Sequence, residues 1–315
     1  MTFNIAGGYQ LVETIFDSGE ATLPFTIDEN LRFERPTEEQ LVALRKIGQA
    51  LGIDLGPFDC SLERIPQENG FTLNRIPLPA DQLRYLLITH NTNGGKLHDF
   101  EQFSSILEPP LRLIFHAWTV EPFGRGQRSG YGWQTQRQLN SIVHEWEVHP
   151  LSDQWLNEVK SLWLRCLSVE GEFPFIKKAI KMLHDLITIP RHHDLYFLGL
   201  FAIVELLLTH NPNDKENADS LRHQISTKVP LLVTRMLRVP NYETFGNDLE
   251  EEKLWKLLYD LRSKIAHGAD TSFDSGEMRR LKSRSTAFDF LDHATRCLLT
   301  HAIREPALVM KLKPI

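Results

Sequence analysis

The chain has 315 residues, of which 42% are hydrophobic and 24% are charged, so it is long enough to bury a sizeable core and to form two domains. Its formal net charge of −6 argues against a protein that coats nucleic acid generally, so any RNA contact is expected at a local basic patch. The three cysteines, Cys60, Cys166 and Cys297, lie far apart without a C-x-x-C pair, which excludes a disulfide framework and a cysteine-based zinc site.

Residues 1–16 lack a basic start and contain polar breaks, so they do not resemble a signal peptide and we expect a cytoplasmic protein. Residues 2–35 are short apolar stretches separated by turn residues, which predicts strands. A helix is expected over residues 38–51, followed by a turn-rich segment over 56–79. Residues 80–89, 100–107 and 111–120 each fit a helix or a strand. The sequence therefore predicts a mixed, β-rich domain over residues 1–150, for which we expect a sensor or regulatory role.

Three motifs in this half resemble functional sites. Asn93–Lys96 lacks the first Gly and the Ser/Thr of a phosphate loop, so it predicts a hairpin turn. His144 and His149 are five residues apart instead of the four of a zinc-protease helix, and their segment fits an alternating strand. Gly124–Trp133 has arginines and aromatic rings that could contact a nucleic acid, but a plain hairpin loop is favoured. No metal site and no cofactor is therefore predicted.

After Pro150 the pattern changes to helical periodicity, which predicts an all-α bundle over residues 151–315 and an α+β chain as a whole. Helices are expected over residues 152–167, 173–188, 195–208, 218–237 with a break at Pro230, 249–267, and from a cap at Ser285 or Thr286 to about residue 304.

The run Leu195–Leu208 is apolar except for Gly199 and Glu205. It is too short to span a membrane and too apolar for a surface helix, so we expect it at the centre of the bundle. Glu205 either finds a cation, with Arg262 as one candidate, or lies on the one wet edge of the helix.

The strongest helix signal is the segment that ends in Leu258-Tyr-Asp-Leu-Arg-Ser-Lys-Ile-Ala-His-Gly268. Asn247 or Asp248 can cap it, and acidic residues at 250–252 suit its first turn. Leucines and Ile265 recur at helical spacing and give one apolar face. Gly268 suits a left-handed turn, so the helix should end near His267.

Arg262 and His267 are the candidate chemical groups of this helix. Arg262 keeps its charge and suits phosphate, whereas His267 can exchange a proton near neutral pH. In a regular helix they lie about 140° apart. A shared site therefore requires a distorted last turn or a second copy of the chain.

The most basic run follows this helix: Arg279, Arg280, Lys282 and Arg284. Such a run is often a solvated face. Because this one is next in sequence to the candidate site, where a phosphate backbone would need neutralising, RNA contact is favoured.

The string LYDLRSKIAHG resembles the motif helix of the HEPN superfamily, in particular its Apea-like branch, and the resemblance extends more loosely over residues 173–304. It implies a helical bundle, usually a homodimer, with both copies of the motif facing one cleft. Many such domains are metal-independent endoribonucleases in bacterial anti-phage defence, abortive infection or toxin–antitoxin systems; others bind RNA or nucleotides without cleaving.

The resemblance implies roles for three residues of this chain. Arg262 would hold the scissile phosphate, His267 would act as general acid and base, and Ser263 would support the site. Arg279, Arg280, Lys282, Arg284 and Glu205 are further candidates for the substrate-binding region. The expected partners are RNA, a second copy, and an antitoxin or a phage-derived trigger.

Overall fold

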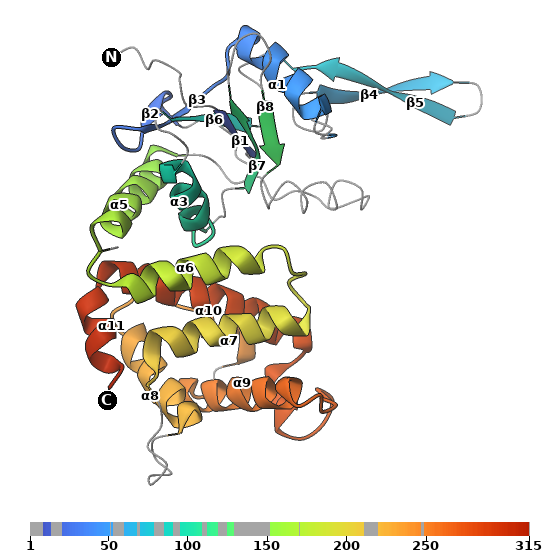
Figure 1. The fold of residues 1–315 in the computed structure, drawn as a ribbon. Coiled ribbons are helices and arrows are strands. Elements are labelled where there is room, and N and C mark those ends of the chain that lie inside the picture. Colours follow the sequence, from blue (N-terminus) through green and yellow to red (C-terminus); the bar gives the residue numbers. More distant parts are fainter. Residues whose placement is uncertain are drawn as a thin grey trace. The chain divides into compact units, whose positions relative to one another are not determined.

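The computed structural model describes residues 9–13, 21–50, 52, 60–67, 70–78, 85–90, 95–108, 112–118, 125–128, 152–169, 171–210, 220–246 and 249–314 (Figure 1). The chain divides into two compact units, residues 1–164 and 165–315, and the division falls inside helix α5 (Asp153–Val169). Strands and helices both occur in the first unit, which confirms the α+β class. Among the described residues, no helix is long and apolar enough to cross a membrane.

The first unit is built on a six-stranded sheet in which every neighbouring pair is antiparallel, in the order β2-β3-β6-β1-β7-β8. Its strands are β1 (Tyr9–Glu13), β2 (Phe25–Thr26), β3 (Leu31–Glu34), β6 (Tyr85–His90), β7 (Arg112–Trp118) and β8 (Arg125–Arg128). Two ambiguous segments of the sequence are therefore strands. The motif from His144 to His149 lies outside the described residues. Within Gly124–Trp133, where a plain hairpin loop was favoured, Arg125–Arg128 form strand β8, and the remaining residues lie outside the described part of the chain.

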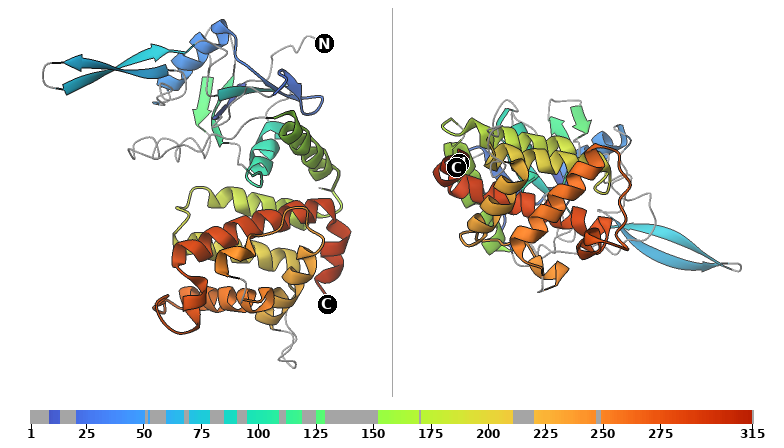
Figure 2. Two further views of the ribbon diagram at one scale, coloured as in Figure 1. Left: turned by 180° about the vertical axis from the view of Figure 1, so that it is seen from behind. Right: turned by 90° about the horizontal axis from the view of Figure 1, so that it is seen from below.

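A separate hairpin of β4 (Cys60–Gln67) and β5 (Gly70–Pro77) replaces most of the expected turn-rich segment. Figures 1 and 2 show it extending away from the six-stranded sheet. The missed signal is Asn69-Gly70, because this dipeptide between strand-like segments is typical of a hairpin.

The helices described in the first unit are α1 (Glu38–Ala50), α3 (Gly95–Ser104) and the start of α5. Since α3 begins at Gly95, the hairpin turn predicted for Asn93–Lys96 is wrong. The core includes the ring of Phe100, whose centroid is 5.1 Å from that of Trp163 and 6.3 Å from that of Phe33. Trp163 also donates a hydrogen bond of 2.7 Å to Asp28. This places the first part of α5 in the core of the first unit.

The described part of the second unit is helical, with α6 (Pro174–Leu186), α7 (Asp194–Leu208), α8 (Leu221–Val233), α9 (Glu251–Ala266), α10 (Arg284–Arg304), α11 (Pro306–Leu312) and the 3-10 turns η2 (Tyr242–Phe245) and η3 (Glu277–Leu281). Two predictions are corrected. Pro230 lies inside α8 and does not break it. The cap of α10 is Ser283, whose hydroxyl accepts a hydrogen bond from the Thr286 N–H at 3.1 Å, not Ser285 or Thr286.

Helix α7 is the centre of this unit, as predicted. It contacts α6, α8, α9, α10 and α11, and Figure 1 shows it between α6 and α9. Its buried residues are Tyr196, Phe197, Leu200, Phe201, Ile203, Val204, Leu207 and Leu208. A helix of this composition is stable only when other elements cover most of it, and in α7 only Leu195, in the first turn, is exposed.

A buried ionic network links α7 to α10. Asp292 accepts hydrogen bonds of 2.7 Å from the Tyr196 hydroxyl and 2.7 Å from Arg191, and it is 3.1 Å from Arg296. Burial raises the pKa of Asp292, but the two arginines and the tyrosine outweigh it, so the pKa is lowered. Burial and the Asp292 charge raise the pKa of Tyr196 to about 12. The network therefore holds Asp292 ionised in the folded protein.

We expect Asp292→Asn to destabilise the protein at pH 7 by roughly 3–5 kcal/mol, because it leaves buried Arg296 without its anion. The folded-state pKa of Asp292 lies below its unfolded value, so its contribution is complete above about pH 4 and is lost as the pH falls through the folded pKa. Urea unfolding should therefore show a smaller difference in the free energy of unfolding between Asp292→Asn and wild type at pH 3 than at pH 7. The control is Asp289→Asn, an exposed position on the same helix; a difference independent of pH would contradict the network.

Candidate functional site at the end of helix α9

Helix α9 is held by one buried face and begins with acidic residues. Glu251 and Glu252 lie in the first turn, and Glu250 at the N-cap makes no side-chain capping bond. The capping candidates Asn247 and Asp248 lie outside the described residues. The buried residues are Leu254, Trp255, Leu257, Leu258 and Leu261. The predicted apolar face is thus confirmed, with Ile265 only half-buried.

The helix ends where predicted, in a complete Schellman motif. His267 is the C-cap and Gly268 has a left-handed φ of 66°. The Ala269 N–H donates to the Lys264 carbonyl at 2.9 Å and the Gly268 N–H to the Ile265 carbonyl at 3.1 Å. His267 is exposed at this end of the helix.

The last turn is not distorted. The His267 N–H still donates to the carbonyl of half-buried Ser263 at 3.1 Å, four residues earlier, as in a regular helix. Arg262 and His267 therefore keep their wide angular separation around α9. Of the two ways to build a shared site, the second copy remains.

Arg262 pairs with Glu205, as proposed from the sequence. Its Nη2 lies 3.3 Å from Glu205 Oε1, across the contact between α9 and α7. Burial raises the pKa of Glu205, and the Arg262 charge partly opposes this shift. Neither Glu205 Oε1 nor Arg262 Nε has a hydrogen-bond partner among the described residues. Glu205 thus contacts the guanidinium and is poorly suited to contact an anionic substrate.

Tyr259 completes this cluster and was given no role in the sequence analysis. Its ring lies 5.6 Å from Arg262 Cζ, within cation–π range, and it contacts Phe201 of α7 edge-on at 6.1 Å. Burial raises its pKa. The signal was the spacing of three residues to Arg262, which places the two side chains as neighbours on a helix. Tyr259 and Glu205 therefore both lie against the guanidinium of Arg262.

The basic run does not join this cluster within one chain. At the start of η3, Glu277 lies 3.8 Å from Lys253, near the N-terminal end of α9. Arg284 forms an ion pair with Asp194, the first residue of α7, and lies 5.0 Å from the ring of Phe288. Glu205 is further along α7 by 205 − 194 = 11 residues, about 16 Å at the helical rise.

The other three basic residues differ in exposure. Arg279 and Lys282 are exposed, whereas Arg280 is half-buried. Arg284 forms an ion pair with Asp194 and lies over the ring of Phe288, so it is the least suited of the four to contact RNA. The charge run is therefore two exposed cations and two more constrained ones, at the opposite end of α9 from His267.

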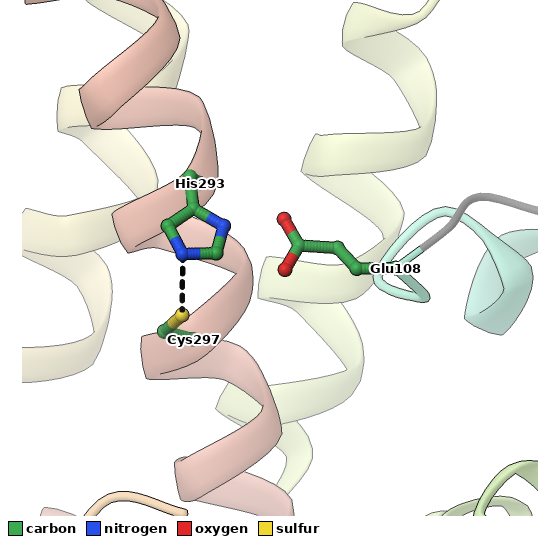
Figure 3. Close-up of side chains that lie close together, drawn as sticks. All are labelled: Glu108, His293 and Cys297. Carbon is green, nitrogen blue, oxygen red and sulfur yellow. Dashed lines mark hydrogen bonds between the residues drawn. The ribbon is translucent and has the colours of Figure 1, made fainter. Parts of the chain in front are cut away.

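A second group of reactive side chains lies on α10. Figure 3 shows His293 and Cys297 one turn apart, with Cys297 Sγ 3.7 Å from His293 Nε2. Glu108, drawn in the same figure, belongs to the first unit. Two ligands on one helix are fewer than the three or four protein ligands of a zinc site, so this pair does not define a metal centre.

Comparison of the chain with family models, curated proteins and solved structures found no match.

We expect Gly268→Ala to lower the free energy of unfolding by about 1–2 kcal/mol, because an L-residue with a side chain is strained at a φ of 66°. No neighbouring atom would clash with the new Cβ, so the strain is confined to the backbone. Gly268→Asn should cost less, since Asn tolerates this region. Gly171→Ala, at a glycine with equal space and no left-handed φ, is the control in urea unfolding. Equal stability of the Gly268 and Gly171 variants would contradict the argument.

Proposed function

We propose that the chain is a metal-independent endoribonuclease of the HEPN type, acting as an effector in bacterial anti-phage defence, abortive infection or a toxin–antitoxin system. The observation that carries this proposal is the state of the motif: Arg262 is oriented by Glu205 and Tyr259, and His267 is exposed at a well-formed helix end. The resemblance of LYDLRSKIAHG to the HEPN motif helix gives these residues their roles.

The chemistry follows from the two side chains. Arg262 neutralises and orients the scissile phosphate. His267 removes the proton from the 2′-hydroxyl, whose oxygen attacks phosphorus as the bond to the 5′-oxygen breaks. A histidine ring in its protonated form supplies the proton to the leaving 5′-oxygen. The products are a 2′,3′-cyclic phosphate and a 5′-hydroxyl end.

Ser263 and Glu205 are assigned supporting roles. Ser263 follows Arg262 on the same helix and is half-buried, and the resemblance gives it a supporting role in the site. Glu205 is a positioning residue, because a carboxylate repels a phosphate but holds a guanidinium in place. We further propose that the first unit governs the activity, in response to an antitoxin or a phage-derived trigger in the cytoplasm.

The proposal is tested with purified protein and RNA in EDTA. Wild type should cleave, with products ending in 2′,3′-cyclic phosphate, and His267→Ala should reduce the rate by about 10²-fold or more, the scale for loss of a general acid or base. Because His267 is exposed and off the buried face, its replacement should change stability by at most about 1 kcal/mol. Binding without cleavage by wild type would instead support a non-catalytic RNA- or nucleotide-binding module.

Arg262→Ala in the same assay should abolish cleavage and cost more stability, about 1–3 kcal/mol, because it leaves the mostly buried Glu205 without its cation. The catalytic role of His267 would be contradicted if the His267→Ala protein unfolded. It would also be contradicted if the folded variant cut RNA at the wild-type rate. Cleavage that EDTA abolishes and magnesium restores would show a different chemistry.

The separation of Arg262 and His267 predicts a homodimer with composite sites. We expect light scattering to give a dimer at micromolar concentration. Arg262→Ala and His267→Ala, each inactive alone, should regain activity when unfolded together and refolded as a mixture, since a mixed dimer contains one site with both residues intact. A fully active monomer, or no recovery in the mixture, would contradict a site shared between copies.

A further inference from the structure

The β4–β5 hairpin has exposed side chains along both faces, and this requires an explanation. Every residue of β5 is exposed, and so are all the described side chains of β4. Phe71 and Leu73 keep more than half of their surface in solvent, at 56% and 54%. An isolated two-stranded ribbon is marginally stable in water, so exposed aromatic and branched residues on it indicate a binding surface.

The register assigns these side chains to two faces. Residues directly opposite each other in an antiparallel pair lie on the same face, and successive residues along a strand lie on opposite faces. Arg64 is paired with Leu73, and the pairs two residues away are Pro66 with Phe71 and position 62 with Arg75. These residues form one face, which we term the Arg64 face.

The two faces differ in charge. The described side chains of the Arg64 face are Arg64, Arg75, Phe71, Leu73, Pro66 and Pro77, with two cations and no carboxylate. Glu63 pairs with Asn74 and therefore lies on the opposite face. In a chain of net charge −6, this segregation is a local basic surface of the kind that a polyanion requires.

Arg64 and Phe71 are arranged as a unit. Arg64 Cζ lies 4.9 Å from the centroid of the Phe71 ring, which is a cation–π contact at the surface. The guanidinium lies over the ring and offers a donor to a phosphate, and the part of the ring that stays exposed offers a stacking surface to a base. Arg75 lies on the same face one pair beyond Leu73, so a second guanidinium follows Arg64 along the strand pair.

We propose that the Arg64 face binds single-stranded RNA, with a base stacked on Phe71 and the phosphate backbone along Arg64 and Arg75. The choice of RNA rests on the proposed ribonuclease function; the basic and aromatic surface itself does not. This gives the first unit a substrate-binding arm that is separate from Arg262 and His267.

The test is fluorescence anisotropy of a labelled single-stranded RNA with the full chain carrying His267→Ala, so that cleavage does not enter. Arg64→Ser with Arg75→Ser should weaken binding about 10-fold or more at 50 mM salt and reduce the salt slope by about 1.4, for two phosphate contacts on a single strand. Phe71→Ala should weaken binding about 5- to 100-fold.

Matched controls separate this surface from general effects. Ile65→Ala truncates an exposed apolar residue of the opposite face and should leave the affinity unchanged. Lys178→Ser with Lys311→Ser removes two exposed positive charges from the second unit and should weaken binding less than the arginine pair does. The proposal would be overturned if Ile65→Ala weakened RNA binding as much as Phe71→Ala does. It would also be overturned if the lysine pair and the arginine pair weakened binding equally.

Photo-crosslinking of uridine-containing RNA to the same His267→Ala chain gives a result that needs no change in the hairpin. The crosslink should map to the β5 peptide around Phe71, and its absence there while RNA is bound would overturn the proposal. Binding of vesicles, or self-association lost in Phe71→Ala, with RNA affinity unchanged, would assign the face to another occupant. Because binding is measured without cleavage, an inactive wild type would refute the proposed function and leave this result standing.

Discussion

The second unit depends on the burial of helix α7. Eight of its fifteen residues are buried, and its apolar surface extends around the helix instead of forming a stripe. Such a helix cannot lie at a protein surface without exposing large side chains, so α6, α8, α9, α10 and α11 all contact it. Burying each large apolar side chain contributes about 1.5–3 kcal/mol, which makes α7 the element around which the bundle assembles.

This constraint also produces the candidate site. A largely buried carboxylate on such a helix must be paired or lose its charge, and Glu205 lies 3.3 Å from Arg262 of α9. A second buried carboxylate, Asp292 of α10, is paired in the same way. It accepts hydrogen bonds from Tyr196, Arg191 and Arg296. The two carboxylates nevertheless differ: the partners of Asp292 outweigh its burial, whereas the single cation near Glu205 does not. Glu205 is therefore the weaker anchor of the two.

The sequence predicts these features where the signal is local. The course of α9 follows from its leucine spacing and Gly268, and the central place of α7 follows from its composition. Predictions fail where distant residues decide. Pro230 was expected to break a helix, at a cost of about 3 kcal/mol, but burial of Val229, Leu232 and Val233 on either side of it outweighs that cost. The β4–β5 hairpin was missed because its strands lack a buried face.

The basic run is the clearest case in which distant residues decide the outcome. It follows the candidate site directly in sequence, which suggested that it lies next to that site in space. The chain after Gly268 returns along α9, so that Glu277 meets Lys253 and Arg284 meets Asp194 at the far ends of α9 and α7. Within one copy, a substrate would have to extend along α9 to contact Arg279 and His267 together. A site shared between two copies does not remove this difficulty, because Arg262 and His267 both lie near the C-terminal end of α9 and would have to meet their counterparts there. The basic run at the other end of α9 would then lie away from such a site, so its charges do not add to the roles of Arg262 and His267.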